Sequence, residues 1–445
     1  MAHGVVSKVA GWGRVPVCDA EEVLDEDLRA AVRGARLTRG LGRSYGDASL
    51  PPHPGARVAA SRRADRLLAF DASTGVLRAE AGLSLARLSE WLLPRGFAVP
   101  VVPGTCYVTL GGMVAADVHG RNHHTAGTIG AYLRSLRLAL ADGRELEVSA
   151  VHEPELFRAT QGGMGLTAHI LEVELALKRI PSPWIWQETE PLRDLDQLLE
   201  RLQAASAEWP FTVSVVDALA GGAALGRGVL IKGRWAEPDE APAQLPRSGF
   251  QPRVPFDLPD WALNRSSARL VNALYRARSR LASQAIVAPR AHFQPLDILR
   301  DWNRGYGKRG FTQYQAVIPR EAGARAVRRL FETLVASAEP PFLCVVKDFG
   351  AAGTGLLSFP RPGTTASIDL PLRGERTQAL VDALNRCVID AGGRVYLAKD
   401  ALTRREHLEA MDGERLRAFD AVRRRYDPER RLSSRLAVRL LGDPA

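Results

Sequence analysis

The sequence predicts an α+β fold, because strand-like and helical segments follow one another without the strict strand–helix–strand rhythm of a doubly wound sheet. In the second half of the chain the strand candidates are 212–216, 229–232, 312–317, 342–346, 366–370 and 394–398. Helices are expected between them at 321–336 and 378–391. No glycine motif of the dinucleotide-binding type opens a helix after a first strand, which argues against NAD as the principal cofactor.

The first half of the chain is interpreted from the same patterns. We expect a short helix over 21–28, where acidic residues come first, and a second helix over 83–93, whose leucines recur on one face. The strand candidates are 67–70, 76–81, 99–102 and 170–178, together with a hairpin over 133–140 and 146–149 that turns at Asp142 and Gly143.

Composition restricts the class of protein. The 445 residues are enough for two or three domains, and 46% of them are hydrophobic, so large cores can form. The four cysteines are scattered without a CxxC pair, which is typical of a reducing compartment. A net charge of +10 without any nucleic-acid-binding motif favours an anionic cofactor, a phosphorylated substrate or an acidic membrane surface over nucleic acid.

We expect the protein to be cytoplasmic or peripherally bound to a membrane. The N-terminal residues lack the apolar core of a signal peptide. The sequence also has no apolar run of the ~18 residues that a transmembrane helix needs.

The glycine-rich stretch 103–130 is the centre of the functional interpretation. It contains six glycines and three histidines, at positions 119, 123 and 124. Glycine lets the backbone approach a ligand closely and lets N–H groups converge on an anion. We therefore interpret the stretch as a pyrophosphate cradle that leads into a reactive centre. A glycine-rich surface loop is the alternative. A zinc site is disfavoured, and no metal is expected, because no Cys or Glu has the usual ligand spacing.

A second glycine-rich loop, 38–50, comes earlier in the chain. Its three glycines flank Arg43, Ser44 and Tyr45. Glycines allow close approach, serine offers a hydrogen bond and arginine a positive charge, which together suit a phosphate-binding turn. A plain turn between strands is the alternative for this loop alone, and the presence of two such loops favours the functional interpretation.

Several motifs carry a resemblance to a known family. The first half contains RGLGRSYGD (39–47), PGT (103–105), TLGG (109–112), DVHGRNHHTAG (117–127) and QGGMGLT (161–167). The second half contains WNRGYGKRGFTQYQ (302–315), VVKDFG (345–350), LSFPRPG (357–363), VYLAKD (395–400) and YDPERRLSS (426–434). Together they resemble the FAD-linked oxidases of the vanillyl-alcohol oxidase type and, more narrowly, the bacterial decaprenylphosphoryl-β-D-ribose 2′-oxidases, over nearly the whole chain.

The resemblance implies a two-domain flavin oxidase. An FAD-binding domain of the PCMH type would comprise residues 1–182 and be completed by 394–445. A substrate-binding domain, 183–393, would cover the isoalloxazine ring with an antiparallel sheet.

The resemblance also implies catalytic roles. FAD would accept a hydride from a carbinol carbon. Lys399 would stabilise negative charge on the reduced ring or orient the substrate hydroxyl; a solvated surface lysine is the alternative, and the apolar residues before it favour the buried end of a strand. His119 is the candidate proton acceptor, the alternative being a histidine that orients the loop. Tyr45 would lie on the same side of the flavin as His119. Arg43 would pair with the cofactor or with a substrate phosphate.

The residues assigned to FAD binding come from the two glycine-rich loops and three later positions. They are Arg39, Gly40, Leu41, Gly42, Arg43, Ser44, Tyr45, Gly46, Asp47, Gly104, Thr105, Thr109, Leu110, Gly111, Gly112, Ala116, His119, Gly120, Asn122, Gly165, Ile170 and Tyr396. Non-covalent attachment is expected, because Tyr45 stands at the position where relatives link the flavin to a His or Cys.

Substrate contacts are assigned by resemblance to five polar residues: Gln313, Gln315, Lys347, Thr365 and Ser367. Gln313 and Gln315 share one face of a strand, because side chains alternate with a period of two; an ordinary polar sheet face is the alternative. Thr365 and Ser367 stand where the mycobacterial enzymes have an Asn and a Cys. Arg121 replaces a Lys of the HGKNHH pattern. These departures leave room for a different sugar or polyol.

The favoured substrate is a polyprenylphosphoryl-β-D-ribose, oxidised at C2′ in an epimerisation toward the arabinose of cell-wall arabinan. A separate NADH-dependent reductase would complete the epimerisation. The alternative enzyme is an oxidase or dehydrogenase of a soluble sugar, nucleoside or polyol. A flavin-free binding protein is the alternative from a different class.

The segment 261–290 has six arginines and no Asp or Glu. Its apolar residues Leu263, Leu270, Val271, Leu274 and Leu281 fall on one face of a helix. A basic amphipathic helix of this kind is expected to border the substrate entrance and to contact anionic lipid. A helix packed on the substrate domain, with its arginines in solvent, is the alternative.

Overall fold

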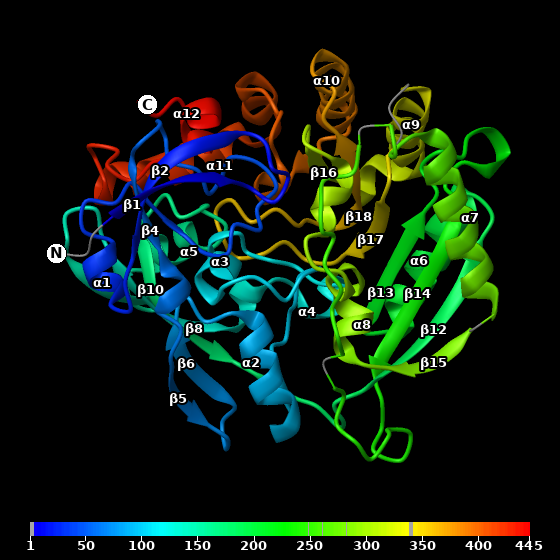
Figure 1. The fold of residues 1–445 in the computed structure, drawn as a ribbon, viewed down its shortest axis with the longest axis horizontal. Coiled ribbons are helices and arrows are strands. Elements are labelled where there is room, and N and C mark those ends of the chain that lie inside the picture. The colour runs from blue at the N-terminus through cyan, green and yellow to red at the C-terminus, as the bar shows by residue number, and fades with distance from the viewer. Residues whose placement is uncertain (1–3, 248, 260, 282, 338–340) are drawn as a thin grey trace.

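The computed structural model describes residues 4–247, 249–259, 261–281, 283–337 and 341–445. In these ranges the chain forms four β-sheets with helices packed between and around them (Figure 1). The N-terminal segment, in blue, and the C-terminal segment, in red, lie together on one side of the molecule, and the largest sheet occupies the other side (Figure 1). Residues from the two ends of the sequence therefore contribute to the same half of the protein.

The first sheet has the strand order β1-β2-β4-β3 and comprises β1 (Gly4–Ala10), β2 (Val17–Leu24), β3 (Leu37–Arg39) and β4 (Arg57–Ala60). The helix predicted over 21–28 is wrong, because β2 runs to Leu24 and pairs with both β1 and β4. Hydrogen bonding to two strands outweighs the local charge pattern. The helix here, α1 (Leu28–Ala31), is short and begins after Asp27, whose side chain accepts a hydrogen bond from the Arg29 N–H.

The second sheet is antiparallel, with the order β5-β6-β10-β8-β9. Its strands are β5 (Leu67–Asp71), β6 (Val76–Glu80), β8 (Leu133–Ala139), β9 (Glu145–Ser149) and β10 (His169–Ala176). The predicted strands 67–70, 76–81 and 170–178 and the predicted hairpin are confirmed, with shifts of one or two residues at their ends. Gly143 has a φ of +90° in the hairpin turn, a conformation that favours glycine.

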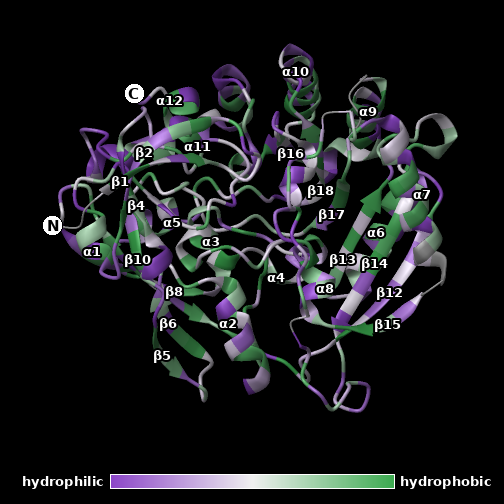
Figure 2. Ribbon diagram, viewed as in Figure 1, coloured by the Kyte–Doolittle hydropathy of each residue, from purple (hydrophilic) through white to green (hydrophobic). Residues whose placement is uncertain are grey.

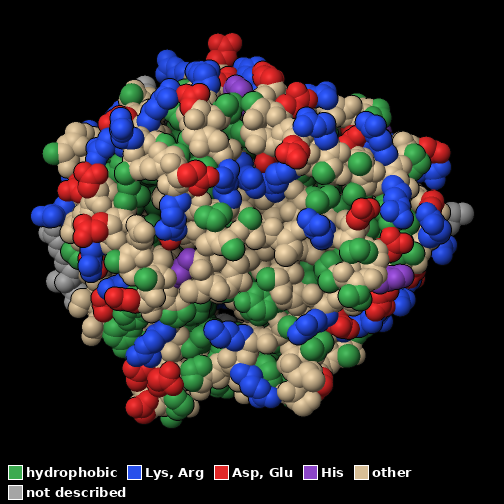
Figure 3. All heavy atoms as spheres, turned by 180° about the vertical axis from the view of Figure 1, so that it is seen from behind, with side chains coloured by type: hydrophobic (Ala, Val, Ile, Leu, Met, Phe, Trp, Pro, Cys, Tyr) green, Lys and Arg blue, Asp and Glu red, His purple; other side chains and the backbone are tan. Residues whose placement is uncertain are grey.

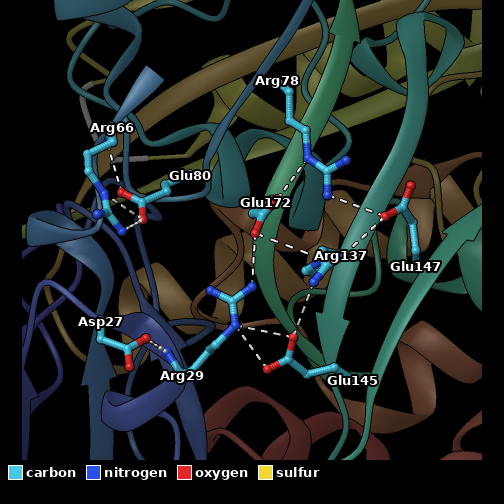
Figure 4. Close-up of polar contacts among 9 residues, drawn as sticks. All are labelled: Asp27, Arg29, Arg66, Arg78, Glu80, Arg137, Glu145, Glu147 and Glu172. Atoms are coloured by element: carbon cyan, nitrogen blue, oxygen red, sulfur yellow. Dashed lines mark hydrogen bonds and ion pairs between the residues drawn. The ribbon is translucent and has the colours of Figure 1, made fainter. Parts of the chain in front are cut away.

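One face of this sheet carries a ladder of ion pairs (Figure 4). The Glu172 carboxylate accepts hydrogen bonds from Arg29 at 3.0 Å and from Arg78 at 2.8 Å, and Arg29 also reaches Glu145. The Arg29 and Arg78 side chains are only partly buried, so each pair contributes on the order of 1 kcal/mol or less, and together they tie α1 to the sheet. The opposite face is buried and includes Leu77, Leu136, Leu138, Val148 and Val173.

The glycine-rich stretch is partly helical, with α3 (Leu110–Ala115) and α4 (His123–Ala126) inside it. The helix predicted over 83–93 is confirmed as α2 (Leu85–Leu92). The strand predicted over 99–102 is wrong: β7 covers Phe97–Ala98 and pairs with β11 (Lys178–Arg179). Pro100 lacks the N–H that a longer strand would need, and its carbonyl accepts a hydrogen bond from the Asn122 side chain. Helix α5 (Pro154–Thr160) follows β9.

The largest sheet has eight strands in the order β15-β12-β14-β13-β17-β18-β16-β19, all antiparallel to their neighbours. The strands are β12 (Ile185–Leu192), β13 (Phe211–Val216), β14 (Gly228–Trp235), β15 (Gln284–Val287), β16 (Phe311–Pro319), β17 (Cys344–Phe349), β18 (Gly363–Pro371) and β19 (Arg394–Val395). Figure 2 shows β13 and β14 mostly in the hydrophobic colour, as expected for buried central strands.

Five of the six strands predicted for this region are confirmed, although β17 begins two residues later than expected. The strand predicted over 394–398 is correct only for Arg394–Val395. After Val395 the chain leaves the sheet and forms a 3-10 turn at Leu397–Lys399, in which the Lys399 N–H donates to the carbonyl of Tyr396. Lys399 therefore lies on a turn rather than at the end of a strand.

Helices α6 (Leu195–Glu208), α9 (Gly323–Ala336) and α10 (Glu375–Asp390) pack against the large sheet, and the predicted helices 321–336 and 378–391 are confirmed. Tyr314 of β16 points to α10, since its hydroxyl lies 3.0 Å from Asn385 Oδ1. Because side chains alternate along a strand, Gln313 and Gln315 point to the opposite face.

The remaining helices are α7 (Arg265–Leu281), α8 (Pro289–Phe293), α11 (Arg405–Tyr426) and α12 (Arg435–Leu441). Helix α7 lies at the edge of the large sheet, whereas α11 and α12 lie beside the first sheet (Figure 1). Among the described helices, none combines the length and the apolar character needed to cross a bilayer.

Candidate active site

The two glycine-rich loops lie against each other. A Cβ on Gly40 would overlap the hydroxyl of Thr109, so the loop 38–50 approaches the start of α3 as closely as only glycine allows. Thr109 is the N-cap of α3, and its hydroxyl accepts a hydrogen bond from the Gly112 N–H at 3.2 Å. The first turn of this helix and the earlier loop therefore form one continuous glycine-rich surface.

The loop 38–50 also contacts the turn that carries Lys399. The Tyr45 N–H donates to the carbonyl of Ala398 at 3.0 Å, and Gly46 packs on the backbone of Asp400. As a result the Lys399 ammonium lies 5.9 Å from the centre of the Tyr45 ring. Residues far apart in the sequence, Tyr45 and Lys399, are thus brought together by backbone contacts.

Two residues assigned to FAD support this loop through protein contacts. The Asp47 carboxylate is buried and paired with Arg439 of α12 at 2.8 Å, and the same guanidinium also binds Asp400. Arg39 donates to the carbonyls of Ala10 and Ser49. Both side chains hold the backbone of the loop in place.

Three of the glycines assigned to FAD face open space. A Cβ at Gly104 or Gly165 would meet no atom within 4 Å, and one at Gly112 would meet the Thr109 hydroxyl alone. In contrast, Gly111 packs on Ala81, and Gly120 packs on the backbone of Val102. The open positions can admit a ligand, whereas the other two serve close packing within the protein.

The remaining residues assigned to FAD differ in exposure and in contacts. Leu110 and Ile170 belong to the hydrophobic core, and Leu41 is exposed. The Ala116 carbonyl accepts a hydrogen bond from the Tyr396 hydroxyl at 2.8 Å. Thr105 donates to the buried carboxylate of Asp297.

Arg43 presents its charge between aromatic rings. Its guanidinium lies 3.8 Å from the centre of the Trp12 ring and 5.1 Å from that of Tyr107. Burial lowers the pKa of Arg43 from its usual range, although Asp297 opposes this. Its neighbour Ser44 accepts a hydrogen bond from the Trp12 N–H through its carbonyl. The guanidinium of Arg43 is therefore fixed in place and poorly solvated, which suits the recognition of an anion.

The five residues assigned to substrate binding share one face of the large sheet. The register of β16, β17 and β18 sets three cross-strand pairs there: Gln313 with Asp369, Gln315 with Ser367, and Lys347 with Thr365. Residues directly opposite each other point to the same side of a sheet. The face is thus polar, and it includes Asp369, which the motif comparison did not single out.

Asp369 is the acidic centre of this polar face. It has no exposed surface, and it accepts hydrogen bonds from the Tyr306 hydroxyl at 2.9 Å and from the Gln313 amide. Burial raises the pKa of Asp369, and these donors and the charge of Lys399 counteract that rise. Lys399 in turn donates to the Ser367 hydroxyl at 3.1 Å. Burial lowers the pKa of Lys399, and the Asp369 carboxylate opposes that shift.

His119 lies in an aromatic cage beside this face. Its ring centre is 4.9 Å from that of Phe349 and 5.0 Å from that of Tyr396. Burial, followed by the charges of Lys347 and Lys399, holds the pKa of His119 well below its usual value, so the ring is neutral. The Gln315 amide NH₂ donates to His119 Nε2 at 3.0 Å, whereas Nδ1 has no partner among the described residues.

Basic side chains lie close together at the site. Burial, then the nearby charges of Lys399 and Arg121, lower the pKa of Lys347 well below its usual value. Burial lowers the pKa of Arg121 to about 10. Cations that are costly to bury and lie close together favour an anionic ligand between them.

Two further acidic and aromatic positions were missed by the sequence interpretation. Asp117 opens the histidine motif and is buried, where it accepts hydrogen bonds from the Ser358 hydroxyl and the Gly130 N–H. Tyr306 stacks on Phe311 at 4.0 Å. Asp369 could have been found, since it follows Ser367 by one strand period, but no sequence signal indicates the contact between Asp117 and Ser358.

The described residues fit FAD. The open glycines lie at the start of α3 and nearby, where N–H groups of a helix terminus can meet a pyrophosphate. On the other side, buried polar atoms lack a protein partner: His119 Nδ1, Gln313 Oε1 and Gln315 Oε1. An isoalloxazine ring offers both donors and acceptors for such atoms, and Lys399 would place a basic side chain near it.

Comparisons with known proteins agree with this chemistry. A family model described as an FAD binding domain matches residues 22–149. The decaprenylphosphoryl-β-D-ribose oxidase of Mycolicibacterium smegmatis is 32% identical over 97% of both chains. An uncharacterized protein of Streptomyces coelicolor is 36% identical over 80% of this chain and 100% of its own length. The L-gulonolactone oxidase of Bos taurus is more distant, with 26% identity over 46% of this chain and 47% of its own.

The similarity to the first of these relatives is high enough, and covers enough of both chains, to define the family. In this chain, the glycine-rich surface is open at Gly104, Gly112 and Gly165, and the polar face holds Lys399 and His119. The chain belongs to the decaprenylphosphoryl-β-D-ribose oxidase family and is an FAD-dependent oxidoreductase acting on a CH–OH group.

Proposed function

We propose that the protein oxidises the C2′ hydroxyl of a polyprenylphosphoryl-β-D-ribose to a ketone. The observation that carries the proposal is the polar face itself, where Lys399, Asp369, Gln315 and His119 form one hydrogen-bonded and electrostatically linked group beside the FAD-binding loops. The full-length similarity to an oxidase named for this substrate class supports the choice of sugar.

The two glycine-rich loops, 38–50 and 103–130, would hold FAD, which would supply a hydride acceptor for the C2′–H bond. The hydroxyl proton would leave to a base or to solvent, and the carbinol carbon would become a ketone. The chain must then orient the sugar, exclude water and compensate negative charge. Lys399 is proposed for the last task, because burial makes its ammonium a strong electrostatic partner.

His119 is proposed to contact the reacting region as a neutral imidazole. In the described arrangement Nε2 accepts from Gln315, so the proton lies on Nδ1, which has no protein partner. A proton on Nδ1 suits donation to a ligand oxygen or nitrogen. If His119 is the proton acceptor, Gln315 must first release Nε2.

Tyr45 and Tyr396 are proposed to border the flavin. Tyr45 lies near Lys399, and Tyr396 stacks against Phe359 with 5.0 Å between ring centres. We also propose non-covalent FAD, an FAD-binding domain of residues 1–182 and 394–445, and a substrate-binding domain of 183–393. The short strand β19 (Arg394–Val395) still pairs with β16, so the large sheet extends to that second boundary.

The product would be a 2′-keto sugar on the same lipid carrier. Epimerisation toward arabinose then requires reduction of the ketone from the opposite face, for which we propose a separate NADH-dependent reductase. Such a step consumes a hydride that this protein does not supply.

Contact with an anionic membrane is proposed for α7. Its residues Leu270, Val271 and Leu274 are exposed by 61%, 53% and 61%, so the apolar face predicted for this helix is turned to solvent. Arg269 is exposed beside them. A helix face that is both basic and apolar is complementary to an anionic bilayer, which favours the membrane as the partner of α7. The proposed substrate gives a second reason, because a prenyl phosphate must be drawn from a bilayer.

One of the six arginines of 261–290 is not available to lipid. Arg276 is paired with the buried carboxylate of Asp217 at 2.6 Å, and Asp217 also binds Arg227 and Asn272. The side chains of Arg278, Arg280 and Leu281 lie outside the described residues. Positive side chains are also scattered, among acidic ones, over the face of the molecule opposite to the view of Figure 1 (Figure 3), so membrane orientation must come from the apolar residues of α7.

Oxidation of a soluble sugar, nucleoside or polyol is the second candidate. The observation that favours it is the hydroxyl character of Thr365 and Ser367, where the mycobacterial pattern has Asn and Cys. Anaerobic bleaching of the flavin by each class of substrate decides between the two candidates, since only the true substrate reduces FAD at a catalytic rate.

A further inference from the structure

A series of hydrogen bonds runs from the backbone of the large sheet to His119. The Thr365 hydroxyl donates to the carbonyl of Ala316 at 2.8 Å. The Gln315 amide NH₂ donates both to the Thr365 oxygen at 3.1 Å and to His119 Nε2 at 3.0 Å. Gln315 and Thr365 belong to β16 and β18, whereas His119 belongs to the glycine-rich stretch 103–130. The series therefore joins the sheet to a loop that is assigned to FAD.

The direction of each bond in this series follows from the bond before it. A hydroxyl has a single proton, and because Thr365 donates that proton to the carbonyl of Ala316, its oxygen can only accept from Gln315. The amide of Gln315 must then turn its NH₂ group toward Thr365, which also directs the second N–H at His119 Nε2. A neutral imidazole accepts at one nitrogen only, so the proton of His119 lies on Nδ1.

We propose that Thr365 is a positioning residue that fixes His119 as the Nδ1–H tautomer, so that His119 meets its ligand as a hydrogen-bond donor and not as a base. The hydroxyl acts through Gln315 and does not itself contact the imidazole. The inference rests on the proposed function only for the identity of the ligand.

The series leaves one donor and one acceptor without a protein partner. His119 Nδ1 and Gln315 Oε1 are both buried, and neither has a hydrogen-bond partner among the described residues. Buried polar atoms are costly unless they are paired, so we expect both to meet a ligand. With the tautomer fixed, the ligand is offered an N–H by His119 and a carbonyl oxygen by Gln315. A sugar hydroxyl or a ring carbonyl can accept from the first, and a hydroxyl or a ring N–H can donate to the second.

The surroundings make the Thr365 hydroxyl hard to replace. Gln315, Thr365 and His119 are all buried, so water does not readily take over a lost hydrogen bond. Burial, followed by the charges of Lys347 and Lys399, lowers the pKa of His119, so the ring carries one proton, on one of two nitrogens. Without the hydroxyl, one N–H of Gln315 would lack its acceptor. The amide could then reverse, and its oxygen would accept from an Nε2–H tautomer.

NMR of the FAD-loaded protein with ¹⁵N-labelled histidine tests the inference, because protonated and unprotonated ring nitrogens differ widely in chemical shift. Comparison with His119→Gln assigns the signals. We expect the proton on Nδ1 in wild type and in Thr365→Ser, which keeps the hydroxyl, and comparable populations of both tautomers in Thr365→Val. Thr364→Val is the matched control and should behave like wild type, since Thr364 lies on the same strand and points to the other side of the sheet.

Gln315→Glu tests the series at its middle. An ionised carboxylate can only accept, so this variant should place a proton on His119 Nε2, and it decides the question if Thr365→Val does not hold FAD. A proton on Nε2 in wild type, or a Thr365→Val spectrum like that of wild type, would overturn the inference.

Flavin reduction gives a second measurement. Thr365→Val should slow it by about tenfold, the scale of one lost hydrogen bond, and Thr365→Ser should restore most of the rate. An equal loss of rate in the serine and valine variants would show that packing, and not the hydroxyl, matters at this position. If wild type fails to oxidise a prenylphosphoryl ribose yet the tautomer responds as described, the proposed function fails and the role of Thr365 stands.

Discussion

The ammonium group of Lys399 donates a hydrogen bond to the hydroxyl of Ser367, with 3.1 Å between Nζ and Oγ. This contact joins the turn after β19, which packs on the loop 38–50, to the polar face of the large sheet. Asp369 lies on the same strand as Ser367 and favours the charged form of the lysine, although burial outweighs it and lowers the lysine pKa. The Lys399 charge is therefore close to the reaction site and weakly screened by water.

Replacement of Lys399 by Ala should leave FAD bound but slow flavin reduction by roughly two to three powers of ten, the scale of one preorganised electrostatic partner. Anaerobic stopped-flow absorbance of the flavin measures this rate. Lys308→Ala, at an exposed lysine, should reduce at the wild-type rate.

The same residue should produce a pH dependence. Lys399 is charged below its pKa, and that pKa is lowered in the folded protein. Flavin reduction by wild type should therefore decline as pH rises through this lowered pKa, below the ~10.4 of a free lysine, and the decline should be absent from Lys399→Ala. A mutant that reduces flavin at nearly the wild-type rate, with the same pH profile, would return Lys399 to a structural role.

Ser367 should make the protein resistant to inhibitors that trap a pocket cysteine. A serine hydroxyl has no thiolate form at neutral pH, so such compounds should bind reversibly, and mass spectrometry of the treated protein should show no adduct on β18. Ser367→Cys is the matched test: a thiol next to the Lys399 ammonium should form the adduct. An adduct on this segment of wild type would show that the pocket was misassigned.

FAD should be released by acid. Tyr45 occupies the loop position at which relatives carry a linking residue, and burial raises the pKa of the nearby thiol of Cys106 to about 12, which makes it a poor nucleophile. After acid precipitation the yellow colour should stay in the supernatant. Colour retained in the washed pellet would instead point to covalent attachment, with His119 or Cys106 to be examined first.

Helix α7 should bind vesicles that contain anionic lipid. The double variant Leu270→Ser/Leu274→Ser and the variant Arg269→Gln should both co-sediment less, the latter by roughly 1 kcal/mol, and binding should weaken with salt. Val151→Ser, at an exposed valine far from α7 in the sequence, is the control for general loss of surface hydrophobicity. Equal sedimentation of all variants, or none by wild type, would remove the membrane role.

Much of the fold could be predicted because its strands and helices have clear periodic patterns. In strands β13, β16 and β18, apolar residues alternate with polar ones or form a continuous run between turns. In helices α9 and α10, the apolar residues form a stripe along one face. The segment 21–28 was misinterpreted because its acidic residues suit a helix start, while pairing with β1 and β4 is a long-range effect. The strand predicted over 99–102 failed for another reason. Its residues are apolar, but Pro100 has no N–H for strand pairing and its carbonyl binds the Asn122 side chain.

The site was only partly predictable. The glycine-rich loops and the alternation of Gln313 and Gln315 are local signals, whereas the pairing of Arg276 with Asp217 depends on how α7 packs. Asp369 follows Thr365 and Ser367 at the strand period of two, so its place on the polar face was predictable, whereas its contact with Tyr306 depends on a distant segment. The roles of Asp47 and Arg39 in holding the loop depend on contacts with distant segments that no motif shows.

Anaerobic titration of the FAD-loaded protein with a polyprenylphosphoryl-β-D-ribose tests the central claim most directly. The account predicts full bleaching of the flavin, a slower reaction when the C2′ hydrogen is replaced by deuterium, and no bleaching by the 2′-deoxy analogue, because the C2′–H bond and its hydroxyl are the reacting groups. Bleaching by a free sugar, nucleoside or polyol, with none by the lipid-linked ribose, would contradict it.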